Sequence, residues 1–131
     1  MEGMFTPVVR IGSADNRTAI SHFLVFANNI KDDHVSSLDE LDGDFLCSIN
    51  TWQLFAGHLL RLAVSGQLMK STAEIYLNGA KHAVKERFKD NPIFKESEWQ
   101  MKLVYNMKNE IKRICIDKNI RLHSYNKTIL T

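Results

Sequence analysis

Four segments of the chain repeat apolar residues at the i, i+3, i+4 spacing of amphipathic helices, and none alternates apolar and polar residues as strands do. The expected helices cover residues 16–30, 50–65, 71–88 and 98–119. In the second of them, apolar side chains occupy most of the circumference, which is typical of a helix at the centre of a bundle. The pattern therefore predicts an all-α fold, a compact bundle of four to five helices.

Polar residues and a glycine set the expected boundaries of the first two helices. Asp15 or Asn16 is the predicted N-cap of the first helix, and Asn50 or Thr51 is that of the second, because these side chains accept from unpaired backbone N–H groups. Gly66 follows the second helix and is expected to end it as a C-terminal capping glycine. The acidic residues 31–44 are expected to form a linker with one helical turn at 38–41.

The third and fourth helices each begin with a sequence typical of a capping box, in which a Ser hydroxyl and a Glu or Gln side chain satisfy backbone N–H groups reciprocally. Ser71 and Glu74 form the first such pair, and Ser97 and Gln100 form the second. Pro92 lies between the two helices, so residues 89–97 are expected to form a connecting loop.

Composition places these helices in one folded domain. The chain has 131 residues, 44% of them hydrophobic and 24% charged, which suffices for one core without disulfides. Cys47 and Cys115 are expected in that core, in a reducing compartment. No apolar run reaches the ~18–20 residues that span a bilayer, and no signal-peptide pattern occurs, so an intracellular protein without a membrane partner is expected. Residues 1–15 are expected to be an N-terminal extension, 16–120 the helical domain, and 121–131 a tail or interdomain linker.

Charge is distributed unevenly along the chain. Residues 1–60 contain three basic and eight acidic residues, whereas residues 61–131 contain fourteen basic and seven acidic ones. Lys81, Lys85 and Lys89 follow one another by single helical turns and are expected on the face opposite the apolar residues of the third helix. The fourth helix carries Lys102, Lys108, Lys112 and Arg113 on its polar face. Either a polyanion-binding surface or a solvated surface with unevenly placed charges explains the asymmetry.

Apolar and aromatic residues interrupt the basic face of the fourth helix: Met101, Tyr105 and Ile116. Three explanations stay open at this point. These side chains either contact nucleic acid, pack on a partner or further domain, or are covered by the C-terminal tail.

No motif for an independent active site occurs in the chain. A Gly-rich phosphate loop, GxSxG, HExxH, an EF-hand loop and the Cys/His spacing of zinc sites are all absent from the sequence. We therefore expect no catalytic residues, no metal and no cofactor.

Residues 50–88 combine a helix that ends at Gly66, a short basic turn, Ser71-Thr72, Tyr76 and an alanine-rich basic helix. This order resembles the N-terminal core-binding, SAM-like domain of tyrosine recombinases, the phage integrase superfamily, in which a G-x-x-x-x-S/T-T-x-x-x-Y turn joins two helices. Thr72 and Tyr76 occupy the matching positions.

The resemblance extends into the fourth helix, where Trp99, Leu103 and the pair Lys112-Arg113 are similar to the last helix of this domain in crypton-type recombinases. It implies a bundle that forms half of a clamp around duplex DNA. In that family a separate C-terminal domain holds the catalytic residues, so this chain is expected to bind DNA without cutting it. The resemblance further implies a C-terminal catalytic domain or another protomer as partner, and a nuclear location in a eukaryote.

The residues themselves also favour phosphate contact. The N-terminus of the third helix offers backbone N–H groups and hydroxyls that can hold a phosphate. Lysine outnumbers arginine on the basic faces, which favours phosphate contact over guanine recognition, and six such contacts would give a slope of log K against log salt of roughly −5. The predicted DNA-binding residues are Lys70, Ser71, Thr72, Asn78, Lys81, His82, Lys85, Lys89, Lys102, Lys108, Lys112 and Arg113. The alternative prediction is an all-helical protein-interaction or dimerisation module that binds a partner through Met101, Tyr105 and Ile116.

Overall fold

Helices account for most of the chain that the computed structural model describes, which is residues 10–117, with side chains from 16 to 115. In chain order the elements are α1 (Arg10–Lys31), the 3-10 helix η1 (Leu38–Glu40), α2 (Gly43–Leu46), α3 (Ile49–Val64), α4 (Lys70–Arg87), α5 (Pro92–Lys95) and α6 (Glu98–Asp117). No strand occurs within residues 10–117, so the predicted all-α fold is confirmed. In the same range no helix is long and apolar enough to cross a membrane.

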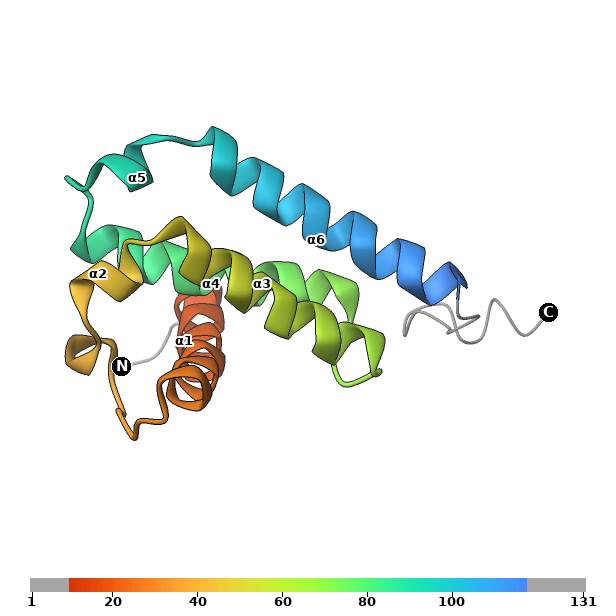
Figure 1. Ribbon diagram of the computed structural model, residues 1–131, viewed down its shortest axis with the longest axis horizontal. Helices are drawn as coiled ribbons and strands as arrows, with labels where there is room; N and C mark the ends of the chain where they lie inside the picture. Colours follow the sequence, from red (N-terminus) through yellow and green to blue (C-terminus); the bar gives the residue numbers. More distant parts are fainter. Residues whose placement is uncertain (1–9, 118–131) are drawn as a thin grey trace.

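The middle of the bundle is formed by α3 and α4, with α1 and α6 on opposite sides (Figure 1). α1 makes its most extensive contact with α4. Gly79 of α4 permits this close crossing, because a Cβ atom there would lie 2.9 Å from the Cβ of Ala19 and 3.0 Å from Asn16 Oδ1. α6 packs mainly on α3 and touches α4 along one side.

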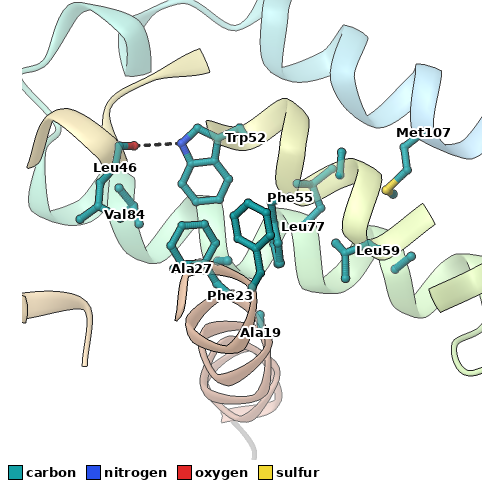
Figure 2. Close-up of a cluster of buried hydrophobic side chains, with 14 of the residues drawn as sticks. Ala19, Phe23, Ala27, Leu46, Trp52, Phe55, Leu59, Leu77, Val84 and Met107 are labelled. Carbon is teal, nitrogen blue, oxygen red and sulfur yellow. Dashed lines mark hydrogen bonds between the residues drawn. The ribbon is translucent and has the colours of Figure 1, made fainter. Parts of the chain in front are cut away.

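Aromatic side chains from α1 and α3 form the centre of the core (Figure 2). The Trp52 ring stacks on Phe23 with centroids 4.8 Å apart, and Phe55 meets Phe23 edge-on at 5.0 Å. The Trp52 indole Nε1–H donates to the carbonyl of Leu46 at 2.9 Å, which ties α2 to the core. Such a bond satisfies both buried polar groups while the ring remains among apolar side chains.

The predicted linker is an ordered part of the fold. η1 forms where one helical turn was expected, and its Leu38 is buried together with Leu41. Arg87 at the end of α4 forms an ion pair with Asp39, so the linker also contacts the central helices.

Helix ends agree with the sequence pattern at some positions and differ at others. α1 begins at Arg10, six residues earlier than expected, so the cap predicted at Asp15 or Asn16 is wrong. The N-cap of α3 is Ser48 rather than Asn50 or Thr51. Gly66 is confirmed as the residue that ends α3. Its φ is 87°, and two reverse bonds, Gly66 N–H to Ala63 and Gln67 N–H to Leu62, form the Schellman motif.

Both predicted capping boxes are wrong. α4 begins at Lys70 after the N-cap Met69, which places Ser71 inside the first turn and leaves Glu74 to pair with Lys108 of α6. Gln100 donates from its amide to the Glu96 carbonyl at 2.6 Å instead of accepting from a backbone N–H.

The predicted loop at residues 89–97 contains the short helix α5. The Asn91 side chain accepts from the Ile93 N–H at 3.1 Å and caps it, and Pro92 occupies its first turn. Phe94, only 2% exposed, anchors α5 in the core. Trp99 donates from its indole Nε1–H to the Ile93 carbonyl at 2.7 Å and so fixes the start of α6.

Candidate nucleic-acid interface

A groove of about 540 Å³ lies between α4 and α6, which run in opposite directions (Figure 1). α4 contributes Asn78 and Lys81 to it. The α6 side supplies Ser97, Gln100, Met101, Val104, Tyr105, Lys108 and Asn109. Two amines, several amides and three apolar or aromatic side chains therefore line the groove, and no carboxylate is among the lining residues.

Lys81 is the least exposed cation of the described chain, with 7% of its surface accessible. The structure gives its amine no hydrogen bond or ion pair within residues 16–115. Burial, with a smaller contribution from the charge of the neighbouring Lys85, lowers the pKa of Lys81 to about 8. Both effects disfavour the charged form, so this amine lacks the partner that a buried cation normally has.

This burial corrects the expectation that Lys81, Lys85 and Lys89 form one solvent-facing row. Lys81 follows Leu77 by four residues and precedes Val84 by three, and both of these are fully buried. Helical spacing therefore places Lys81 at the edge of the core face of α4. Lys85 and Lys89 are exposed as expected.

Two of the predicted cations already have carboxylate partners. Lys108 lies 3.1 Å from Glu74, and this pair joins α6 to α4 at one end of the groove. Arg113 pairs with Glu110 on the same helix and holds the pKa of that carboxyl below its usual range. Neither cation is as available for a phosphate as the sequence suggested.

The remaining lysines differ in where they lie. Lys85 follows Lys81 by one turn on α4, and Lys112 follows Lys108 by one turn on α6. Lys85 and Lys112 therefore lie on the same helix stripes as the two lysines that line the groove. Lys102 lies elsewhere, because it lines a smaller cavity with Ile49 and Gln53 near α3. Within the described side chains, Lys85, Lys89, Lys102 and Lys112 are exposed and have no carboxylate partner.

The start of α4 holds three further predicted residues. Lys70 and Thr72 are half-buried, and Ser71 is exposed in the first turn. His82 is exposed on α4 and lies 4.0 Å from Glu86.

The groove also contains two residues predicted to bind a protein partner. Met101 is 70% exposed and Tyr105 is 65% exposed, and both line the groove with Lys81. The side chain of Ile116 lies outside those that the structure describes. The two predicted sites, one for DNA and one for a partner, thus share one surface at Met101 and Tyr105.

Half of the polar residues of the groove, Ser97, Gln100 and Asn109, were not predicted from the sequence as binding residues. Ser97 and Asn109 lie one turn before Met101 and one turn after Tyr105, so these four positions follow each other at intervals of four along α6. That spacing was visible in the sequence and marks one stripe of a helix. Its position opposite Asn78 and Lys81 depends on the packing of α6 on α4.

Comparisons with known proteins add no relative. No family model matches the chain, and neither the curated proteins nor the solved structures contain a match. The resemblance to tyrosine recombinases stays a prediction from the sequence. Within residues 16–115, no three His, Cys, Asp or Glu side chains gather as metal ligands would.

Proposed function

We propose that the chain binds duplex DNA through the sugar–phosphate backbone, as the core-binding domain of a tyrosine recombinase does, and that α4 and α6 form the interface. One observation carries the proposal. The groove between these helices is lined by the amines of Lys81 and Lys108 and by no carboxylate, and Lys85 and Lys112 follow these two lysines by one helical turn each.

The lysines along α4 and α6 extend over a distance that matches several nucleotides of a DNA strand. Lys70, Lys81 and Lys85 share one stripe of α4, and Lys112 extends the facing stripe of α6. Lys70 and Lys85 are separated by roughly 22 Å along the helix axis, at 1.5 Å per residue. That distance corresponds to about six base pairs at the 3.4 Å spacing of one strand.

Lysine at these positions supports backbone contact rather than base recognition. An ammonium group is a compact charge, whereas bidentate recognition of guanine is typical of arginine. Arg113, the arginine of α6, is held by Glu110. Binding should therefore depend strongly on salt and weakly on sequence.

Fluorescence anisotropy with a labelled generic duplex tests the proposal across a series of salt concentrations. Four amines on the facing stripes of α4 and α6 lack a carboxylate partner, and together they give an expected slope of log K against log salt of roughly −4. They are Lys70, Lys81, Lys85 and Lys112. The double variant Lys85→Glu/Lys112→Glu should bind more weakly, with a slope reduced by about two.

The matched control is Arg17→Glu/Lys31→Glu, which makes the same change in net charge at two exposed positions of α1. It should retain most of the affinity. If wild-type protein does not bind at low salt, or if both double variants lose the same affinity, the proposed interface is refuted. Circular dichroism of each variant confirms that the helices remain folded.

A protein-docking role is the second candidate, and the exposed side chains of Met101 and Tyr105 favour it. In that case Met101→Ser/Tyr105→Ser should abolish self-association in sedimentation velocity runs at increasing protein concentration. A wild-type chain that remains monomeric throughout would count against dimerisation by this surface.

A further inference from the structure

Lys81 is the most unusual residue in the groove, because only 7% of its surface is exposed and yet its amine has no hydrogen bond or ion pair within residues 16–115. A buried cation without a partner is costly, and proteins usually satisfy one with a carboxylate. Glu74, a carboxylate on the same helix, is engaged by Lys108 at 3.1 Å. An anion that enters the groove would give the amine of Lys81 a partner of opposite charge.

The charges closest to Lys81 along the groove are those of two further lysines, of which Lys108 is paired with Glu74. Lys85 is its neighbour on α4, and Lys108 and Tyr105 face it from α6. The groove adds hydrogen-bond donors from Asn78 and Gln100, which suit the several acceptor oxygens of a phosphate. A phosphate diester in a DNA strand presents two charged non-bridging oxygens, and the deoxyribose attached to it exposes C–H groups that can pack on apolar side chains.

The apolar part of the groove fits that sugar. Met101 and Tyr105 are exposed on the wall that faces Lys81, and Val104 lies between them. A volume of about 540 Å³ leaves room for a group attached to the phosphate.

We propose that the groove between α4 and α6 is a phosphate subsite, in which Lys81 binds one backbone phosphate of the duplex while Met101 and Tyr105 contact the adjoining deoxyribose. This inference rests on the proposed function, because it names the part of the interface where the strand is most deeply seated. It differs from that function in assigning the decisive contact to a buried amine instead of the exposed ones.

The test compares duplex binding by wild type, Lys81→Met and Tyr105→Ser, with Lys95→Met on α5 as the matched control. Lys81→Met should weaken binding about tenfold and reduce the salt slope by about one, since it removes one charge-assisted contact. Tyr105→Ser should weaken binding with the slope unchanged, because it removes an apolar contact only. Lys95→Met alters an exposed lysine outside the groove and should bind as wild type.

A spectroscopic measurement reports on the groove directly. In nuclear magnetic resonance spectra, the chemical shifts of the Met101 methyl group and of Lys81 Cε should change when a short duplex is added. Inorganic phosphate at the same concentration should change these chemical shifts less. Shifts produced by phosphate and not by duplex would identify a site for free phosphate and overturn the proposal.

The outcomes separate this inference from the proposed function. If wild type and Lys81→Met bind duplex equally, the subsite is refuted while the interface of exposed amines stands. If wild type does not bind duplex at any salt concentration, both fail together.

Discussion

Replacing Lys81 with Met tests the electrostatic description of the groove without DNA, because Met fills similar space and carries no charge. In the folded chain, burial lowers the pKa of Lys81 from 10.5 to about 8. Between these two values the unfolded chain binds more protons than the folded one, so stability should rise with pH in that window. The cost of the buried charge is fully present below pH 8 and disappears as the pH rises through 10.5.

The size of the effect follows from the same two values. The lowered pKa sets an upper limit of about 3 kcal/mol on the stability lost at pH 7 and of about 1 kcal/mol at pH 10, and solvent in the groove reduces both values. Lys81→Met should therefore unfold with a free energy up to about 3 kcal/mol higher than wild type at pH 7. That advantage should shrink by about 2 kcal/mol when both proteins are compared at pH 10.

Urea denaturation followed by circular dichroism measures these differences at pH 7, 8, 9 and 10. Titration of the other lysines and the tyrosines affects both proteins alike, so the difference between them isolates Lys81. Lys95→Met is the control, since an exposed lysine should change stability little at any pH. The reasoning is refuted if Lys81→Met is less stable than wild type at pH 7, or if its advantage is the same at pH 7 and pH 10.

Three further predictions concern the fold. Gly79→Ala should destabilise the protein by about 1–3 kcal/mol in urea melts, despite its better helix propensity, because the new Cβ would lie 2.9 Å from Ala19. Gly57→Ala on α3 is the matched control, because the nearest atom to its new Cβ would be Arg61 Nη1 at 4.0 Å. This substitution should stabilise the protein by up to about 1 kcal/mol. If both substitutions change the free energy of unfolding in the same direction, the close α1–α4 crossing is contradicted. Gly66→Ala should lower stability by about 1 kcal/mol, because a φ of 87° is strained for alanine, and an unchanged urea midpoint would count against the C-terminal capping role. Trp52→Phe should lower the free energy of unfolding by about 1–3 kcal/mol, because it leaves the Leu46 carbonyl without its hydrogen bond. Backbone amides of α2 should then exchange their hydrogens faster. Unaltered exchange would mean that the indole hydrogen bond does not hold α2.

The long helices could be predicted from the sequence because each carries its own periodic apolar stripe. Gly66 could also be predicted, since a glycine directly after an apolar helix satisfies a requirement of the local backbone. The capping boxes could not, because a Ser-x-x-Glu/Gln sequence becomes a box only where the helix begins directly after the Ser and the Glu or Gln side chain turns back to it. Ser97 does directly precede α6, but Gln100 bonds to the Glu96 carbonyl instead. α4 begins one residue before Ser71, and Glu74 is then free to bond across to Lys108.

The candidate site depends on contacts between helices, which explains why its parts were predicted and its assembly was not. Lys81 and Met101 were each singled out from their own helix, as a DNA contact and a partner contact. Only the packing of α6 beside α4 places them in the same groove. The burial of Lys81 could have been predicted from the sequence, because Leu77 and Val84 lie one turn away on either side of it. The regular spacing of Lys81, Lys85 and Lys89 instead indicated a single exposed row.

The two experiments on Lys81 are most informative together. A lysine whose charge lowers the stability of the free protein is hard to explain by folding, since an apolar residue of similar length would serve the core better. Binding of an anion to the folded chain would reverse that cost, because it supplies the partner that the amine lacks and stabilises the folded state by mass action. Functional sites often retain groups that are unfavourable until the ligand is present. If Lys81→Met is both more stable and weaker in binding DNA, the amine is retained for its ligand, whereas a gain in stability with unchanged binding would leave the buried charge without a functional explanation.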